Sequence, residues 1–284
     1  MTNRTGLARI ARDTLDIIER GEYVAPNGMR VSIAAWQAHA EEHSVLYRPE
    51  EFDDAMRRRD ALLAESPSQS TRFEVLNTTT LEAARGQLAA DSRRDPLCLN
   101  FASAKNPGGG FLGGSRAQEE SLARSSGLYP CIQPMQEMYQ TNRALRSCLY
   151  TDHMIYSPQV PVICDDEGRL LDEPYRISIL TAPAVNAGAV RKNRPQDVPR
   201  IAATMIERME KLLSVAALHG HAHLVLGAWG CGVFKNDPAD VAEWFHQFLA
   251  ANHVLSGAFE TVTFAVTDWS DERRFIGPFQ QRFR

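Results

Sequence analysis

The order of hydrophobic and polar positions predicts a helical first segment followed by strands that alternate with helices. Apolar residues recur at helical spacing in residues 3–20, and residues 34–43 and 49–65 are further helical candidates. Beyond residue 70, short apolar runs predict strands and amphipathic stretches predict helices. The expected strands are 72–77, 96–102, 153–157, 160–163, 176–181, 223–227 and 261–266, and the expected helices are 80–90, 134–145, 195–218 and 238–250. This alternation is typical of an α/β layer sandwich.

The same pattern predicts one core with an extension. We expect residues 1–70 to form a helical extension packed on a core of residues 71–284, with the Ser-Pro-Ser-Gln-Ser stretch at 66–70 marking the junction. The stretch Asp165-Asp-Glu-Gly168 predicts a hairpin turn within the core. The sequence shows no repeat or low-complexity tract that would divide the core further.

Two glycine-rich segments indicate where the protein could bind a ligand and carry out chemistry. The first, Asn106-Pro-Gly-Gly-Gly-Phe-Leu-Gly-Gly-Ser-Arg-Ala-Gln-Glu-Glu120, places five glycines directly before two carboxylates. Glycine accepts positive φ and lets the main chain approach a ligand, so N–H groups of this loop can hold a phosphate or pyrophosphate. The candidate binding residues are Asn106, Gly108, Gly109 and Gly110.

The residues after these glycines predict a short helix that anchors the two acids. Ser115 and Gln118 have the spacing of a capping box, which predicts a helix that starts just after Ser115 and stops at Gly127 in the left-handed conformation. Successive helical residues diverge by roughly 100°. Glu119 and Glu120 therefore cannot flank one bond as the acid pair of a common glycosidase does, and any glycosyl chemistry depends on one acid.

The second segment, Gly227-Ala-Trp-Gly-Cys-Gly-Val-Phe234, repeats the strand, loop and helix order. Asp237 and Pro238 suit the start of the helix that follows. In open α/β sheets ligands lie beyond the carboxyl ends of the strands, so both loops can converge on one diphosphate. Taken alone, this second cluster is more typical of a simple turn. The residues expected to contact the ligand are Gly230, Cys231, Gly232, Val233 and Phe234.

Composition narrows the class of function. The chain has 284 residues, 44% of them hydrophobic, and no apolar run near the roughly 20 residues that cross a bilayer. Its amino terminus lacks the apolar stretch of a secretory signal, so we expect a cytoplasmic protein without membrane contact. Five cysteines without a CxxC pair argue against a disulfide framework and a zinc site. A net charge of −4 argues against direct sequence-specific nucleic-acid binding and requires any phosphorylated polymer to be held locally.

Together these segments resemble the bacterial-type poly(ADP-ribose) glycohydrolases, which are catalytic members of the macrodomain fold. Three glycines, seven intervening residues and Gln-Glu-Glu carry the resemblance, with Leu99-Asn-Phe-Ala-Ser-Ala-Lys-Asn-Pro107 before them. The segment at 227–234 is similar to the second phosphate loop of that family, and Thr181-Ala-Pro-Ala-Val-Asn-Ala-Gly188 lies between the two. The resemblance covers residues from about 97 to 240. It implies a macrodomain-like three-layer sandwich with a central mixed sheet and an N-terminal helical extension.

The resemblance also implies an activity: hydrolysis of the ribose-ribose O-glycosidic bonds of poly(ADP-ribose), with release of ADP-ribose. Glu120 would be the general acid and then the general base, and Glu119 would bind hydroxyls of the adjoining ribose. Gln118 would support the turn or contact the same sugar, while Phe234 would pack on the terminal ribose. Asn186 and Thr267 are expected contacts to adenosine. Poly-ADP-ribosylated proteins are the implied partners, and no metal or other cofactor is implied.

Two other functions remain open at this stage. A macrodomain that only binds ADP-ribose would keep the loops without needing Gln118, Glu119 and Glu120, so these residues favour hydrolysis. A hydrolase of single ADP-ribose groups on proteins would share the pocket, and the sequence separates it less well.

Four further features are more typical of structure than of function. His219, His221 and His223 alternate, and a turn and strand entry is a better interpretation of them than a metal site. Residues 57–59, three arginines among acidic residues, indicate a solvated helix face. Cys231 has no nearby histidine that would activate it as a nucleophile, and Trp229 is expected in the core.

Overall fold

A mixed sheet of seven strands forms the centre of the protein in the computed structural model, which describes residues 3–65, 70–250 and 253–283. The strand order is β3-β6-β7-β5-β8-β9-β4. The five strands from β7 to β4 run parallel to one another, and β6 is antiparallel to β7. Strand β3 pairs antiparallel with β6 and so runs in the same direction as the other five. The strands of the sheet are β3 (Val45–Tyr47), β4 (Arg72–Leu76), β5 (Leu97–Phe101), β6 (Met154–Cys164), β7 (Leu170–Ala182), β8 (His223–Leu226) and β9 (Thr261–Ala265).

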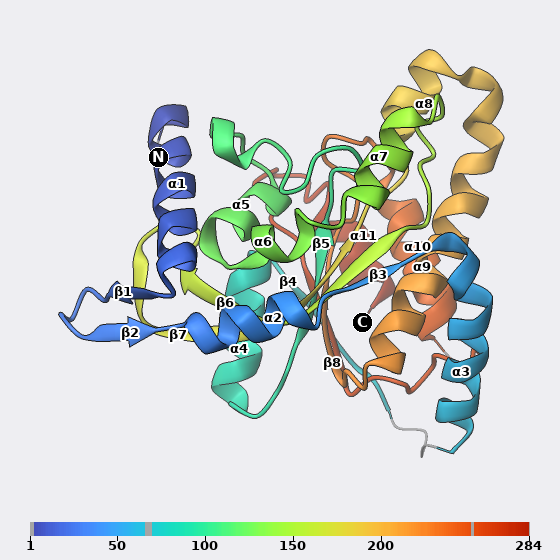
Figure 1. Ribbon diagram of the computed structural model, residues 1–284. Helices are drawn as coiled ribbons and strands as arrows, with labels where there is room; N and C mark the ends of the chain where they lie inside the picture. The colour runs from blue at the N-terminus through green and yellow to red at the C-terminus, as the bar shows by residue number, and fades with distance from the viewer. Residues whose placement is uncertain (1–2, 66–69, 251–252, 284) are drawn as a thin grey trace.

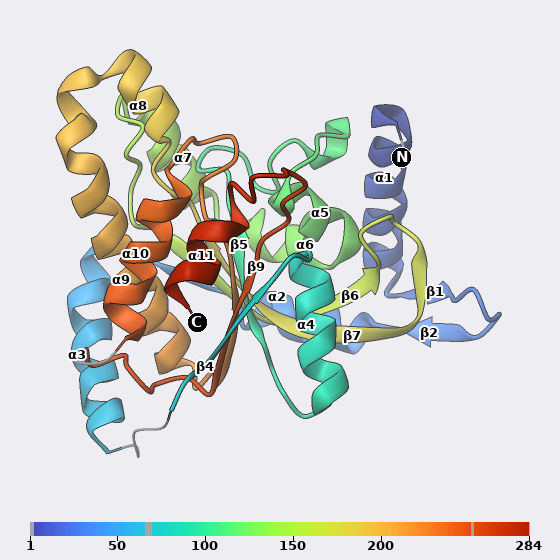
Figure 2. The same cartoon turned by 180° about the vertical axis from the view of Figure 1, so that it is seen from behind.

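Helices cover both faces of this sheet (Figures 1 and 2). One apolar cluster joins a face of the sheet to the layer that includes α9 and α10, and a second joins the other face to the layer that includes α4 and α6. The first layer holds α3 (Phe52–Ala64), α8 (Ala187–Asn193), α9 (Ile201–Leu218), α10 (Pro238–Leu249) and α11 (Ile276–Arg282). The second holds α2 (Ala34–Glu42), α4 (Thr80–Ala90), α5 (Gln118–Ser125), α6 (Leu128–Ile132) and α7 (Gln136–Ala144). The predicted α/β sandwich with a central mixed sheet is confirmed.

Local chemistry explains where several elements begin and end. In α1 (Arg4–Arg20) the Asn3 side chain accepts a hydrogen bond from the backbone N–H of Gly6, and Gly21 ends the helix with φ 72°. Thr79 and Glu82 form a capping box at the start of α4. The central strand β5 is buried at four consecutive positions, as expected for a parallel strand covered on both faces.

Two predicted elements have different bounds in the structure. The strands expected at 153–157 and 160–163 are one strand, β6, with a bulge between Ser157 and Val160 that a periodicity of two does not reveal. The helix expected at 195–218 begins as a 3₁₀ turn, Pro195–Arg200, and becomes α-helical only at Ile201. Pro199 lacks the N–H that an α-helical turn needs at this point.

The N-terminal segment contains strands that the sequence pattern does not reveal. β1 (Glu22–Val24) and β2 (Arg30–Ser32) form a separate hairpin, and β3 pairs with β6 at the edge of the main sheet. Each has three residues, which is too short for an alternating pattern to be recognised. The division of the chain at residue 70 stays a prediction, and residues 66–69 of the expected junction lie outside the described residues.

Other expectations concern single features of the fold. The turn at Asp165 to Gly168 is confirmed: it joins β6 to β7, the N–H of Gly168 donates to the carbonyl of Asp165, and Gly168 has φ 79°. Trp229 is fully buried, as predicted. Within residues 3–65, 70–250 and 253–283, the helices are all too short or too polar to cross a bilayer.

Candidate active site

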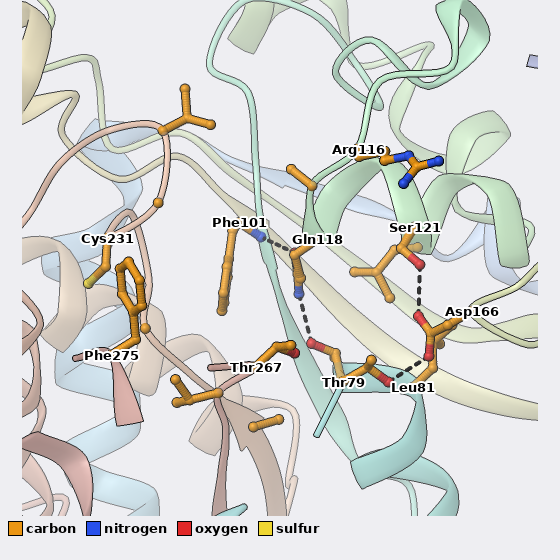
Figure 3. Close-up of a pocket in the computed structure, with 18 of the residues that line it drawn as sticks. Thr79, Leu81, Phe101, Arg116, Gln118, Ser121, Asp166, Cys231, Thr267 and Phe275 are labelled. Carbon is orange, nitrogen blue, oxygen red and sulfur yellow. Dashed lines mark hydrogen bonds between the residues drawn. The ribbon is translucent and has the colours of Figure 1, made fainter. Parts of the chain in front are cut away.

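The loops after the parallel strands meet at one edge of the sheet and enclose a cavity of about 950 Å³. Because β5, β8, β9 and β4 are parallel, their carboxyl ends lie at the same edge, as the sequence predicts for the two glycine loops. Figure 3 shows Gln118 beside Phe101 on one side of the cavity, with Cys231 and Phe275 on the other.

The cavity brings together part of the predicted site. Of the predicted binding residues, those that line it are Gln118, Gly230, Cys231, Gly232, Val233, Phe234 and Thr267. The lining does not extend to the others: Asn106, Gly108, Gly109, Gly110, Glu119, Glu120 and Asn186. Asn186 is the N-cap of α8, where its side chain accepts a hydrogen bond from the N–H of Ala189.

Glu119 and Glu120 are joined to the first glycine loop and its surroundings. The N–H of Gly110 donates to Oε1 of Glu120 at 3.0 Å. The N–H of Ser103 donates to Oε2 of Glu119 at 2.7 Å, and Nδ2 of Asn100 lies 3.5 Å from its Oε1. Glu119 is buried and Glu120 is half-buried. Glu120 is therefore bonded to the glycine loop and Glu119 to residues at and just after the end of β5.

Gln118 does not cap its helix as predicted. The expected capping box is wrong: α5 begins at Gln118, its N-cap is Ala117, and no side chain caps it. Oε1 of Gln118 instead accepts from the N–H of Phe101 at 2.8 Å, and Nε2 donates to the carbonyl of Leu99 at 2.7 Å. Gln118 thus bonds to the main chain at the end of β5, a long-range contact that the local capping pattern does not show.

The predicted end of this helix at a left-handed Gly127 is also wrong. The helix ends at Ser125, Ser126 is extended, and Gly127 has φ −77°. A Cβ at this position would collide with the end of the Gln37 side chain, which would have to move.

The first glycine loop leaves no room for side chains near the acids. Gly108 and Gly109 have φ of 68° and 59°. A Cβ on Gly109 would lie 2.5 Å from Oε1 of Glu120 and 3.0 Å from Oε2 of Glu119. The glycines therefore provide both the left-handed backbone and close contact with the two carboxylates.

Helix α1 braces this loop and the acid-bearing helix from outside. Nε of Arg4 donates to the carbonyl of Gly113 at 2.8 Å, and the hydroxyl of Thr14 donates to the carbonyl of Arg124 in α5 at 2.6 Å. Ala11 forms a buried apolar cluster with Phe111 and Ala123. The N-terminal helix is therefore part of the support of the site, which its amphipathic pattern alone does not indicate.

The second glycine loop is packed as tightly as the first. Gly230 has φ 73°, and a Cβ there would lie 2.6 Å from Cβ of Ala184 and 2.6 Å from Nδ2 of Asn236. Nδ2 of Asn236 donates to the carbonyls of Val185 and Gly230. Cys231 is buried, and burial raises the pKa of its thiol, so it is not a ready nucleophile.

The segment after β9 forms a further wall of the cavity. Although burial opposes it, hydrogen bonds from Ser270 and from the backbone N–H groups of Ile276 and Phe275 lower the pKa of Asp268 to about 2. These bonds fold the chain so that Phe275 lines the cavity beside Thr267. Sequence reasoning missed Phe275 because its position depends on this turn.

Asp166 is a second lining residue that sequence reasoning missed. Its carboxylate accepts hydrogen bonds from the hydroxyls of Thr79 at 2.6 Å and Ser121 at 2.8 Å (Figure 3). It joins the β6–β7 turn to the starts of α4 and α5. The turn itself was recognisable in the sequence, but its approach to the cavity was not.

The histidine and arginine groups lie away from the cavity. The ring of His219 stacks on Tyr156, and Nε2 of His221 pairs with the hydroxyl of the same tyrosine. In the part of the chain that the structure describes, no cluster of three or more metal-ligating side chains occurs. The predicted solvated face at residues 57–59 is wrong for Arg59, which is buried and donates to Ser214 and Glu210. Its position on the α3 side that faces α9 explains the difference.

The protonation of Glu119 gives a testable pH dependence of stability. Burial raises the pKa of Glu119 from 4.5 to about 8, and the negative charge of Glu120 adds to this effect although the N–H of Ser103 opposes it. A raised carboxyl pKa stabilises the folded state below the unfolded pKa, and this stabilisation is lost as pH rises through the folded pKa. We expect the free energy of unfolding of the wild type to fall relative to that of Glu119→Gln between about pH 5 and about pH 8.

Urea unfolding of both proteins across this range measures the difference. Replacement of the exposed Glu173 by glutamine is the matched control and should give no such trend. Parallel curves for the wild type and Glu119→Gln would show that Glu119 is not protonated in the folded protein.

The fold and the site together define a class: an α/β enzyme in which a glycine-rich loop contacts an acid pair on one helix. The chain belongs to the microbial-type poly(ADP-ribose) glycohydrolase (PARG) family, whose catalytic-domain signature matches residues 11–165. A comparison with curated protein sequences gave no significant match.

Solved structures agree with this assignment. The chain is similar to the poly(ADP-ribose) glycohydrolase of Thermomonospora curvata, with 46% identity, a TM-score of 0.92 and coverage of 99% of this chain and 100% of that one. The same enzyme bound to the inhibitor ADP-HPD gives a TM-score of 0.89 at 46% identity, again covering 99% and 100%. The Deinococcus radiodurans poly(ADP-ribose) glycohydrolase in complex with ADP-ribose gives 46% identity, a TM-score of 0.81 and coverage of 89% and 99%.

Proposed function

We propose that this protein hydrolyses the ribose-ribose bonds of poly(ADP-ribose) and releases ADP-ribose. The observation that carries the proposal is the contact between Glu120 and the N–H of Gly110, which fixes one carboxylate on the helix whose Gln118 and Ser121 line a cavity of about 950 Å³. Membership of the PARG family and the similarity to a relative solved with ADP-ribose support it.

The cavity has the chemistry that an ADP-ribose unit requires. The backbone of Gly230 to Phe234 presents a tight loop suited to the diphosphate. The rings of Phe101, Phe234 and Phe275 offer apolar surface for the adenine and the riboses. The net charge of −4 means that this local grip, rather than the overall field, holds the anion.

In the proposed mechanism one carboxyl group serves both steps. Glu120 in its acid form donates a proton to the ribose oxygen that leaves, and the bond between that oxygen and the anomeric carbon breaks. The substrate diphosphate stabilises the oxocarbenium-like centre that develops. The ionised Glu120 then takes a proton from water as the water oxygen bonds to the anomeric carbon. Glu119 hydrogen-bonds hydroxyls of the adjoining ribose and fixes its register.

Several parts of the proposal rest on the sequence and the family resemblance. We place the core among the macrodomains, with residues 1–70 as an extension of residues 71–284. The partners are poly-ADP-ribosylated proteins in the cytoplasm, and neither direct sequence-specific binding of nucleic acid nor a membrane is part of the proposal. Asn106, Gly108 and Asn186 are proposed as substrate contacts outside the cavity lining described above.

The test is the product released from two substrates. Purified protein is incubated with poly-ADP-ribosylated protein and, separately, with mono-ADP-ribosylated protein, and free ADP-ribose is measured by chromatography. We expect release from the polymer, with the single protein-linked unit left in place. Release from the mono-modified protein at a similar rate would instead indicate a mono-ADP-ribosyl hydrolase. Binding of ADP-ribose without any release would indicate a reader.

A further inference from the structure

Tyr150 has a backbone conformation that is unfavourable for its residue type. It lies between α7 and β6 and has φ 61°, in the left-handed region that bulky residues rarely adopt. Residues held in such conformations require surrounding contacts that fix them, and they are often found at functional sites. The contacts around Tyr150 therefore show what holds this backbone conformation and which residue the side chain meets.

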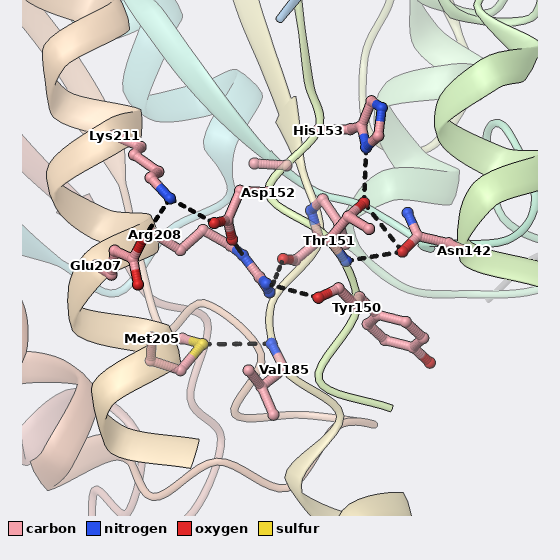
Figure 4. A network of polar contacts seen from close by, with 12 residues as sticks. Asn142, Tyr150, Thr151, Asp152, His153, Val185, Met205, Glu207, Arg208 and Lys211 are labelled. Carbon is pink, nitrogen blue, oxygen red and sulfur yellow. Dashed lines mark hydrogen bonds and ion pairs between the residues drawn. The ribbon is translucent and has the colours of Figure 1, made fainter. Parts of the chain in front are cut away.

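A buried arginine fixes this conformation. Arg208 of α9 is fully buried, and its Nη2 donates to the carbonyl of Tyr150 at 3.2 Å while its Nε donates to Oδ1 of Asp152 at 2.7 Å (Figure 4). Its Nη1 donates to the carbonyl of Pro183 at 3.0 Å, at the end of β7. One guanidinium thus joins the Tyr150 backbone to the residues after β7, where Ala184 packs against Gly230 of the second glycine loop.

Further hydrogen bonds hold the residues that follow Tyr150. Nζ of Lys211 donates to the other oxygen of Asp152 at 2.6 Å, and Oδ1 of Asn142 accepts from the N–H of Thr151 at 2.8 Å. Burial alone would raise the pKa of Asp152, but Arg208 and Lys211 together lower it, so the carboxylate stays ionised and paired. The residues on both sides of Tyr150 are therefore held from several directions.

The side chain of Tyr150 faces Phe234 at the end of the second glycine loop. Its ring centroid lies 6.1 Å from that of Phe234, at an interplanar angle of 48°. Burial raises the pKa of its hydroxyl, and the nearby side chain of Asn186 opposes this rise. Phe234 lines the cavity whereas Tyr150 does not, so Tyr150 contacts a lining residue without being part of the lining.

We propose that Tyr150 is a positioning residue for Phe234, and that the Arg208–Asp152 pair holds Tyr150 in the conformation that this role needs. The inference rests on the proposed function, in which Phe234 packs on the terminal ribose. Tyr150 acts through Phe234 without contact to the substrate. The contact between the two aromatic rings limits the rotation of the Phe234 side chain. Phe234 is therefore already in its binding orientation before the substrate arrives.

The test compares Tyr150→Gly, Tyr150→Ala and Tyr150→Phe. Glycine and alanine both remove the ring, but only glycine relieves the left-handed backbone. We expect both to weaken ADP-ribose binding by about three- to tenfold and to raise KM for the polymer by a similar factor, with a smaller change in kcat. Tyr150→Phe, which keeps the ring, should stay within about twofold of the wild type. Calorimetric titration with ADP-ribose, steady-state kinetics and thermal unfolding give these values.

Gln159 provides the matched control. It has φ 50° at the bulge of β6 and lies outside the cavity lining. Gln159→Gly and Gln159→Ala should change thermal stability without changing the affinity for ADP-ribose. If the Tyr150 variants behave in the same way, Tyr150 is only structural and the inference is wrong. Wild-type protein that neither binds ADP-ribose nor cleaves the polymer would overturn the proposed function, and this inference with it.

A double-mutant cycle tests the role of Arg208. Lysine cannot donate to three separated acceptors as the guanidinium does, so Arg208→Lys should weaken ADP-ribose binding in the wild-type background. In the Tyr150→Gly background the same change should have little further effect on affinity, because the ring that it positions is gone. Additive effects would show that Arg208 does not act through Tyr150. If Arg208→Lys does not fold, the comparison of the Tyr150 variants still decides the main inference.

Discussion

Replacement of Glu120 by glutamine is expected to lower kcat on poly(ADP-ribose) by about three orders of magnitude. The amide cannot donate the proton that the leaving ribose oxygen needs, and it cannot activate water afterwards. Glutamine keeps an oxygen that can accept from the N–H of Gly110, so the loop geometry should be preserved. Single-turnover assays for free ADP-ribose measure the loss.

Binding of ADP-ribose separates chemistry from folding in this variant. Calorimetric titration should give an affinity within a few-fold of that of the wild type, because the cavity proposed to hold the nucleotide is lined by other residues. Glu119→Gln should lose less activity than Glu120→Gln. If Glu119→Gln is the more damaged of the two, the roles assigned to the adjacent acids are reversed.

The second large effect is expected from one methyl group on the first glycine loop. Gly109→Ala would place a Cβ 2.5 Å from Oε1 of Glu120 and 3.0 Å from Oε2 of Glu119, and its φ of 59° is unfavourable for alanine. Both carboxylates must move, and a misplacement of about 1 Å can cost about 100-fold in rate. We expect a fall in kcat of about that size with a smaller change in affinity for ADP-ribose.

Gly86→Ala is the control for this variant. Gly86 lies within α4, and a Cβ there would meet no atom within 4 Å. Alanine should raise the free energy of unfolding by roughly 0.5–1 kcal/mol and leave kcat unchanged. Activity of Gly109→Ala equal to that of the wild type would refute the tight packing of the loop on the two acids.

Much of the fold was predictable because it depends on local patterns. The helix at 3–20, the strand at 72–77 and the helix at 80–90 match α1, β4 and α4 closely. The errors lie where residues distant in sequence decide the outcome. The bulge in β6 depends on pairing with β7, and the burial of Arg59 depends on contact with α9. No window of neighbouring residues contains that information.

The candidate site shows the same division. The clusters of glycine at 108–110 and at 230 and 232 were recognisable in the sequence, and the structure requires glycine at Gly108, Gly109 and Gly230, which have positive φ and close neighbours. The spacing of Gln118 from Ser115 fits a capping box, so the sequence predicts a cap there. In the structure the side chain of Gln118 instead forms hydrogen bonds with the backbone of Leu99 and Phe101 at the end of β5. Asp166 and Phe275 come from segments that carry no catalytic pattern, and only the folded chain places them at the cavity.

The amino-acid sequence by itself determined the alternation of strands and helices after residue 70, the two glycine loops and the presence of both acids on one helix. These features follow from backbone preference and side-chain periodicity, which act over a few residues. The tertiary structure decided the strand order that brings the loops together, the burial that raises the pKa of Glu119, and the contact of Tyr150 with Phe234. Burial and long-range hydrogen bonds join residues from different elements, so they exist only once the sheet has assembled.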